Sequence, residues 1–271
     1  MSFGAYDAKT DIKVATLNIW QKFGPWEERM PRLAEGIAAL SVDVIGLQEV
    51  RVDAEFDQGV ALAKDTGFTY VFGAGYEHPD GVTGNAILSR FPVLRSGTQQ
   101  LPEGNRSQGR CLVFAVLETP LGHLPFFTTH LNWELDDGES REAQVRAITA
   151  LVPELSKGCD LPAVLTGDFN ADPDSDEMRY LRGLTGVFGP RVYYADAWIY
   201  GGDASFGATY SKTNPFGEVF REPERRIDYI YVREPAQSRG EPIETRVCMT
   251  EPIRGMHPTD HYGLAAAIRM R

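Results

Sequence analysis

The stretch from residue 165 to residue 173 (LTGDFNADP) constrains this chain more than any other. Residues 162–165 before it are apolar and are stopped by Gly167, which predicts a short buried strand. Asp168 and Asn170 follow at the carboxyl end of that strand, so both side chains leave the same face if the backbone stays extended. A carboxylate and a carboxamide aimed together can orient a water molecule and hold an anionic oxygen. The alternative is an ordinary turn, because Asp, Asn and Pro are all turn residues.

Other apolar segments also end on polar residues or carry one. The residues concerned are Asn18, Glu49, His130, Asn132, Asp168, Asn170, Asp228, Asp260 and His261. Strand ends on one edge of a layered fold can converge on a single pocket. Glu49 and Asp260, helped by Asn18, offer the hard oxygen ligands that suit Mg²⁺ or Mn²⁺. An ion there would polarise a phosphoryl oxygen and neutralise developing charge.

The acidic and amide residues each have a structural interpretation as well. Glu49 would cap the helix that follows it or pair with a basic residue. Asn18 would satisfy backbone groups at a strand end. Asp228 would face water or pair with Arg225 or Arg226.

The basic candidates carry weaker signals. His130 alone is more typical of a structural histidine, and Asp260 with His261 fits a plain turn. We expect His78, His123 and His257 to lie on the surface. Arg110 and Arg141 would contact phosphate or form solvated salt bridges.

The hydrophobic pattern predicts an α/β fold. Helices are expected at residues 27–40, 53–66, 139–151 and 175–184. Strands are expected at residues 12–20, 42–48, 68–72, 85–89, 93 onward, 111–117, 124–129, 162–165, 226–232, 244–249 and 262–268. Residues 73–84 are expected to form a loop and residues 203–225 a rim loop. Strands in runs with helices between them suit two packed sheets flanked by helices, in one domain over residues 1–271.

Composition limits the partners and the compartment. The formal charge is −11, from 27 basic and 38 acidic residues, which weakens nonspecific binding of nucleic acid. No apolar run approaches the roughly 20 residues of a membrane span, and the start lacks a signal-peptide pattern. The three cysteines (Cys111, Cys159 and Cys248) suit neither a disulfide framework nor a zinc site, so a cytoplasmic location is expected.

Several motifs occur in an order that resembles the endonuclease/exonuclease/phosphatase superfamily of metal-dependent phosphoesterases. They are residues 17–20 (LNIW), 43–50 (DVIGLQEV), 84–93 (GNAILSRFPV), 129–133 (THLNW), 167–170 (GDFN), 226–230 (RIDYI) and 259–261 (TDH). The GDFN motif is the most specific. The family often has Ser where Thr259 stands. The resemblance implies a DNase I-like, four-layer αββα sandwich with two mixed sheets face to face. It also implies Glu49 as the main ligand of Mg²⁺ or Mn²⁺, with Asn18 and Asp260 nearby.

The resemblance implies catalytic roles too. Asp168 would orient the attacking water, and Asn170 would bind the scissile phosphate. His261, oriented by Asp228, would act as an acid–base or phosphate-stabilising group, and His130 would donate to a phosphoryl oxygen. These roles agree with in-line attack of water on phosphorus.

The substrate is constrained less than the reaction. Members of the superfamily that this chain resembles cleave DNA, RNA tails, phosphoinositides, sphingomyelin or small phosphodiesters. The net charge favours a small or lipid-like phosphoester. A nuclease is the second hypothesis, supported by basic residues at Arg106, Arg110, Arg221, Arg225 and Arg226. A catalytically inactive binding protein is the third, disfavoured because the full residue set is present.

The expected substrate contacts are Arg110, Asn132, Tyr210 and Phe216. Specificity is expected in the rim at residues 207–216, where Tyr210 and Phe216 would stack on a base, a ring or an acyl chain. The alternative is that both aromatic side chains pack within the loop itself.

Overall fold

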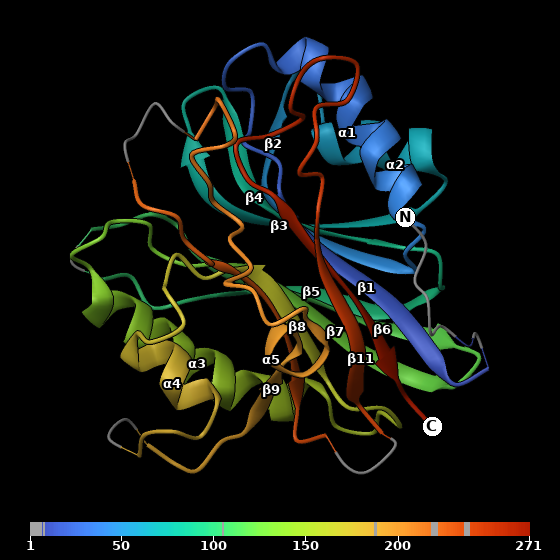
Figure 1. Cartoon of the computed structure of the whole chain (residues 1–271), viewed down its shortest axis with the longest axis vertical. Helices are drawn as coiled ribbons and strands as arrows, with labels where there is room; N and C mark the ends of the chain where they lie inside the picture. The colour runs from blue at the N-terminus through green and yellow to red at the C-terminus, as the bar shows by residue number, and fades with distance from the viewer. Residues whose placement is uncertain (1–6, 8, 105, 187–188, 218–221, 236–238) are drawn as a thin grey trace.

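Two six-stranded mixed sheets lie face to face in the computed structural model (Figure 1). The structure describes residues 7, 9–104, 106–186, 189–217, 222–235 and 239–271. The first sheet has the order β11-β12-β1-β2-β4-β3. Its strands are β1 (Asp11–Asn18), β2 (Val44–Asp53), β3 (Thr69–His78), β4 (Gly81–Ser89), β11 (Glu241–Cys248) and β12 (Gly263–Arg269).

The second sheet has the order β5-β6-β7-β8-β10-β9. Its strands are β5 (Val93–Gln100), β6 (Cys111–Thr119), β7 (Gly122–His130), β8 (Val164–Asp168), β9 (Tyr194–Asp196) and β10 (Asp228–Arg233). In each sheet one central pair is parallel: β1 with β2, and β7 with β8. These four strands therefore carry their carboxyl ends to one edge of each sheet.

Helices cover the outer faces of both sheets (Figure 1). α1 (Trp26–Leu40) and α2 (Gln58–Thr66) pack on the first sheet, with α1 contributing Met30, Leu33 and Ile37 to an apolar cluster there. α3 (Gly138–Leu155) and α4 (Asp176–Leu181) pack on the second sheet. The short α5 (Ala197–Gly201) lies against β11. The molecule is thus the four-layer αββα sandwich that the motifs implied, and this prediction is confirmed.

The sandwich explains why the strands are apolar on both faces. Val14 and Ala15 are neighbours on β1, and their side chains leave opposite faces. Val14 joins the cluster between the sheets, whereas Ala15 joins the cluster under α1 and α2. None of the helices in the described part of the chain has both the length and the apolar character that crossing a bilayer requires. All three cysteines are free thiols.

The predicted loop at residues 73–84 is wrong. β3 extends to His78 and pairs antiparallel with β4, which begins at Gly81. The glycines that suggested a loop instead allow close backbone approach: a Cβ on Gly84 would lie 2.0 Å from the carbonyl oxygen of Gly73. A register shift between Ala74 and Tyr76 bends this hairpin.

The second helix begins later than expected. Its N-cap is Asp57, whose side chain accepts a hydrogen bond from the Val60 amide at 3.0 Å. Asp53 instead accepts bonds from the Glu55 and Phe56 amides and closes a turn before the helix. The sequence also gave no signal for β9 and α5, because both are very short.

Gly46 sets how closely the two sheets approach near their centre. It lies on β2, and a Cβ there would meet the side-chain oxygens of Thr166 on β8 at 2.3 Å and of Thr128 on β7 at 2.5 Å. Thr128 also accepts a bond from Gln48 at 2.8 Å, so the facing threonine is held in place. Only a glycine fits without moving one sheet.

Replacing Gly46 with alanine should therefore destabilise the fold. Overpacking of a close-packed interior costs about 1–3 kcal/mol of unfolding free energy. Urea denaturation followed by circular dichroism measures the change. Gly186→Ala is the matched control, because no atom lies within 4 Å of a Cβ at that position. Equal stability of the two variants would contradict the proposed sheet contact.

Candidate active site

The two sheets are joined at one edge by a hydrogen bond between Asn18 and Asp168. Asn18 ends β1 in the first sheet, and Asp168 ends β8 in the second. The Asn18 Nδ2 group donates to Asp168 Oδ2 at 3.0 Å and to Glu49 Oε1 at 3.3 Å. Its Oδ1 accepts from the Trp20 amide at 2.9 Å. Asn18 thus turns its donor side toward two carboxylates.

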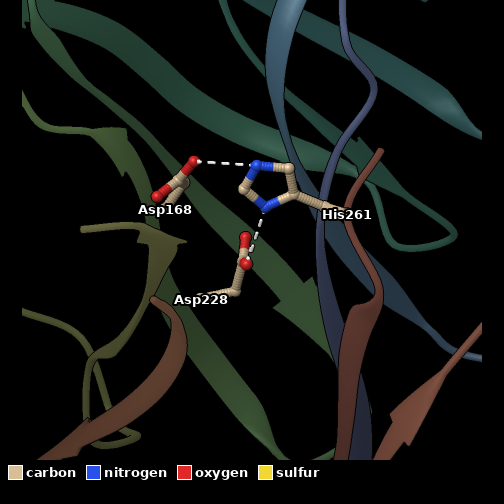
Figure 2. A group of neighbouring side chains, drawn as sticks. All are labelled: Asp168, Asp228 and His261. Carbon is tan, nitrogen blue, oxygen red and sulfur yellow. Dashed lines mark hydrogen bonds and ion pairs between the residues drawn. The ribbon is translucent and has the colours of Figure 1, made fainter. Parts of the chain in front are cut away.

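A histidine–aspartate pair crosses the same boundary (Figure 2). Asp228 is the first residue of β10, and His261 precedes β12. His261 Nδ1 lies 2.9 Å from Asp228 Oδ2, and Nε2 lies 3.8 Å from Asp168 Oδ2. All three side chains are buried. The imidazole therefore lies between two carboxylates of the opposite sheet.

Burial and charge shift the protonation of this group in opposite directions. Burial raises the pKa of Asp168 to about 7, and the nearby Asp228 adds to this effect. Burial alone would lower the pKa of His261, but Asp228, Asp260 and Asp168 together hold it well above its usual value. The imidazole is accordingly held as a cation that can donate from Nε2.

His130 is held in the opposite state. Burial, Arg110 and His261 keep the pKa of His130 well below its usual value, so the ring is neutral. Arg110 Nη1 lies 2.9 Å from His130 Nδ1, and because a guanidinium can only donate, Nδ1 accepts. The proton of the neutral ring then sits on Nε2, which lies 3.5 Å from Asp168 Oδ2. This N–H faces the centre of the site.

Asn170 completes this side of the site. Its backbone has a φ of 50°, in the left-handed region, and its amide donates to Asp168 Oδ1 at 2.9 Å. Its Nδ2 donates to the Leu131 carbonyl oxygen at 3.1 Å and lies 2.9 Å from His130 Nε2; because Nε2 carries the ring proton, this second contact brings two donors together and is not a hydrogen bond. Asparagine tolerates this conformation better than most residues, which is why the turn after β8 can place it there.

Glu49 and Asp260 supply two more carboxylates. Glu49 occupies a break in the β2–β4 register with a φ of 58°, and Gln21 donates to its Oε2 at 3.2 Å. Thr259 donates to Asp260 at 3.2 Å and to the Asn18 carbonyl oxygen at 2.7 Å. Burial raises the pKa of Asp260 to about 6, and the charge of Glu49 contributes. Neither carboxylate has an ion-pair partner among the described residues.

These residues fit a divalent cation. Four carboxylates, from Glu49, Asp168, Asp228 and Asp260, surround the His261 imidazolium, with Arg29 and Arg110 as further nearby cations. Asp228 Oδ1 is buried with no hydrogen-bond partner among the described residues. Ligand atoms of Asp168, Asp228 and His261 lie within 4.8 Å of one another, a spacing that one ion could bridge. Since His261 Nδ1 is already bonded to Asp228, the pair Glu49 and Asp260 offers the freer oxygen set.

A cavity of about 610 Å³ opens above these side chains. Its lining includes nine of the predicted site residues: Asn18, Glu49, Arg110, His130, Asp168, Asn170, Tyr210, Asp260 and His261. The Tyr210 ring lies edge-on to that of His261, with ring centroids 5.2 Å apart. The polar strand ends predicted to converge are thus brought to one place, with Asp228 buried directly behind His261.

Other predicted contacts lie elsewhere. Asn132 is buried, donates to Asp137 at 2.8 Å and accepts from Gln144 at 2.9 Å, so its amide supports the α3 start and does not line the cavity. Phe216 is half-buried and packs on Trp20, with ring centroids 4.9 Å apart. Arg141 forms a buried ion pair with Glu177 at 2.8 Å, not a solvated one.

The structural alternatives for two carboxylates are wrong. Asp228 neither faces water nor pairs with the neighbouring arginines, because Arg225 pairs with Asp172 and Arg226 with Asp196. Glu49 does not cap α2, whose cap is Asp57.

Sequence reasoning missed two groups near the site. Arg29 is fully buried and donates to carbonyl oxygens of the segment after β1 and of Pro258, so it ties the Asn18 and Asp260 loops together. An arginine on the apolar face of a helix was the available signal.

His78 was expected on the surface, yet it lines the cavity beside Tyr76, and His257 is buried.

Comparison with known proteins agrees with this geometry. The sequence pattern of the Endonuclease/Exonuclease/phosphatase family matches residues 15–261. The chain belongs to this family. Members of this endonuclease/exonuclease/phosphatase family hydrolyse phosphate esters, so the chain is a phosphoester hydrolase.

Relatives match over nearly the whole length. The YbhP protein of Escherichia coli (strain K12) is 24% identical over 275 residues, which cover 96% of each chain. A family member from Bacteroides thetaiotaomicron has a solved structure with a TM-score of 0.76 at 18% identity, covering 97% of this chain and 98% of that one. The mannosyl-6-phosphatase Bt3783 of the same species has a TM-score of 0.74 at 19% identity, covering 95% and 99%. The structural matches show the shared fold.

The raised pKa of Asp168 predicts how stability depends on pH. The Asp168 carboxyl keeps its proton to about pH 7 in the folded state but loses it near pH 4 in the unfolded state. Its contribution to the free energy of unfolding should therefore fall as the pH rises from about 4 to about 7. In chelator, Asp168→Asn should therefore gain stability relative to wild type as the pH rises from 4 to 8. Urea denaturation at several pH values measures this. If the unfolding free energies of wild type and Asp168→Asn changed in parallel with pH, the raised pKa of Asp168 would be contradicted.

Proposed function

We propose that this protein hydrolyses a small organic phosphate ester with the help of Mg²⁺ or Mn²⁺. The observation that carries the proposal is an open cavity of about 610 Å³, where two of the lining arginines, Arg106 and Arg225, are already paired with carboxylates. A volume of this size suits a small-molecule ligand. The phosphate would lie at the polar floor, and the organic group would fill the remainder.

The state of the arginines disfavours a polyanion. Arg106 pairs with Glu134 at 2.9 Å, and Arg225 pairs with Asp172 at 3.1 Å and Glu222 at 3.0 Å. Binding of a nucleic-acid backbone relies on cations that are free to replace counterions.

The remaining basic residues of the nuclease hypothesis add little to it. Arg226 is buried against Asp196, and Arg110 is turned inward to His130. Arg221 lies outside the described residues. The net charge of −11 also disfavours binding of a polyanion. A nuclease is therefore the alternative outcome of the test below and not the proposal.

The side chains divide the reaction between them. Asp168 would orient a water molecule for attack on phosphorus, and the water gives up one proton to solvent as its oxygen bonds to phosphorus. The ester oxygen leaves on the opposite side with the bonding electron pair and takes up a proton from solvent. Asn170, neutral His130 and cationic His261 would donate to the phosphoryl oxygens as charge develops. A divalent ion held by Glu49 and Asp260 would supply Lewis-acid polarisation, with Asn18 orienting Glu49 and Thr259 orienting Asp260.

Asp228 and Arg110 would act through their histidines. Asp228 holds His261 at 2.9 Å and favours its charged form. Arg110 fixes the tautomer of His130 from the other side. Tyr210 packs its ring edge against His261 and limits the positions of the imidazole. None of the three needs to touch phosphorus.

A substrate screen tests the proposal. With Mg²⁺, the purified protein should hydrolyse a chromogenic phosphodiester or phosphomonoester, while plasmid DNA and single-stranded RNA stay intact at the same enzyme concentration. Turnover of the small ester should change little between 50 and 200 mM salt. Efficient cleavage of nucleic acid with a steep salt dependence would instead establish the nuclease.

Removal of divalent ions should abolish turnover. Excess EDTA is expected to lower the rate by at least about 100-fold, since the Lewis acid is lost, and added Mg²⁺ or Mn²⁺ should restore it. Glu49→Gln should raise the Mg²⁺ concentration needed for half-maximal rate by about tenfold or more. Glu77→Gln, an exposed change outside the cavity, is its control. Full turnover in EDTA would refute the metal requirement.

His261→Gln should lower kcat by roughly 10²–10⁴-fold, the range for loss of a proton donor. In the wild type, rising pH removes the imidazolium proton and the rate should fall. The variant has no such group, so this alkaline decline should disappear. His123→Gln, at an exposed position away from the site, should keep the wild-type profile. An unchanged pH profile for His261→Gln would remove this residue from the mechanism.

A further inference from the structure

Three aromatic side chains surround the opening of the catalytic cavity. Phe23, Tyr76 and Trp133 all line it, and they are 51%, 45% and 57% exposed. We call these three residues the aromatic mouth. Single exposed aromatic residues are common on protein surfaces, but three around one polar cavity form an apolar surface at the place where a substrate enters.

The three rings come from separate segments whose backbones are held in place. Phe23 follows β1, and its carbonyl oxygen accepts from buried Arg29 at 2.9 Å. Tyr76 lies on β3 with its ring centroid 4.7 Å from that of His78, in an edge-on arrangement. Trp133 follows β7, and its amide donates to Gln108 at 3.2 Å. The backbone is therefore ordered while the rings stay available, which lowers the entropy cost of binding.

The aromatic residues expected to bind the substrate are already occupied. Tyr210 donates from its hydroxyl to the Gly217 carbonyl oxygen at 3.1 Å and packs against His261. Phe216 packs on Trp20 and does not line the cavity. The solvent-exposed rings beside the cavity belong to the aromatic mouth instead: Tyr76 contacts His78 and Phe23 contacts Trp20, but about half of each side chain stays accessible to a ligand.

We propose that the aromatic mouth binds a planar aromatic ring in the organic part of the substrate. This deepens the function proposed above and rests on it. Ring stacking favours a flat π-system over a saturated group of equal size. The cavity of about 610 Å³ has room for a phosphate together with a ring system at its opening. The substrate class is thus an aryl or arylmethyl phosphate ester.

A matched ester series tests the proposal. Benzyl, cyclohexylmethyl and ethyl phosphates are compared as monoesters and as methyl diesters, with the released alcohol measured by chromatography. Benzyl and cyclohexylmethyl groups are similar in size and differ in planarity and π-character. We expect kcat/KM to be about tenfold higher for the benzyl ester than for the cyclohexylmethyl ester, with the ethyl ester lowest.

Variants locate the preference. Trp133→Ala and Tyr76→Ala should each bring the benzyl to cyclohexylmethyl ratio close to one. Phe206→Ala removes an aromatic side chain that is similarly exposed (52%) but does not line the cavity, and it should keep the wild-type ratio. Circular dichroism verifies that each variant is folded.

The outcomes separate the two proposals. Equal rates for benzyl and cyclohexylmethyl esters, or a benzyl preference that survives both Trp133→Ala and Tyr76→Ala, would overturn the aromatic mouth while leaving the small-ester function in place. No turnover of any ester in the series, with cleavage of DNA or RNA, would overturn the proposed function itself.

Discussion

The site depends on how the two sheets meet at one edge. Asn18 and Asp168 bond at 3.0 Å, and Asp228 and His261 at 2.9 Å, with the partners on opposite sheets in both pairs. Twisted sheets lie about 10 Å apart, so only side chains at matching strand ends can reach across. The close contact at Gly46 holds that spacing, since one added carbon there would meet both facing threonines.

This arrangement places negative charge where it is poorly solvated. Burial raises the pKa of Asp168 to about 7 and that of Asp260 to about 6, so keeping these groups ionised opposes folding. Three apolar clusters, one between the sheets and one under each helical layer, supply the opposing stability. A cation bound only by the folded state would offset the repulsion by mass action. The electrostatics thus couple folding to the chemistry that we propose.

Chemistry and selectivity are separated in space. The floor of the cavity is built from strand ends, which the sheets hold rigidly. The three rings of the aromatic mouth come from the segments after β1 and β7 and from the β3–β4 hairpin. The opening is therefore aromatic, whereas the floor is made of carboxylate, amide and imidazole side chains. Ion pairs such as Arg106 with Glu134 neutralise the cations that a polyanion would use. The proposals for reaction and for ring binding therefore use different residues, and the aromatic mouth can fail while the proposed reaction stands.

The sequence by itself determined the layers and most of the polar floor. Apolar strands that end on Asn18 or Asp168 carry a local signal, because burial on both faces and a polar last residue are visible in the chain. Only the tertiary structure decided which polar groups meet. It turned the side chain of Asn132 to Gln144 and packed Phe216 on Trp20. It also placed Tyr76 and Trp133 at one opening, since contacts between residues far apart in sequence are set by sheet packing and leave no local pattern.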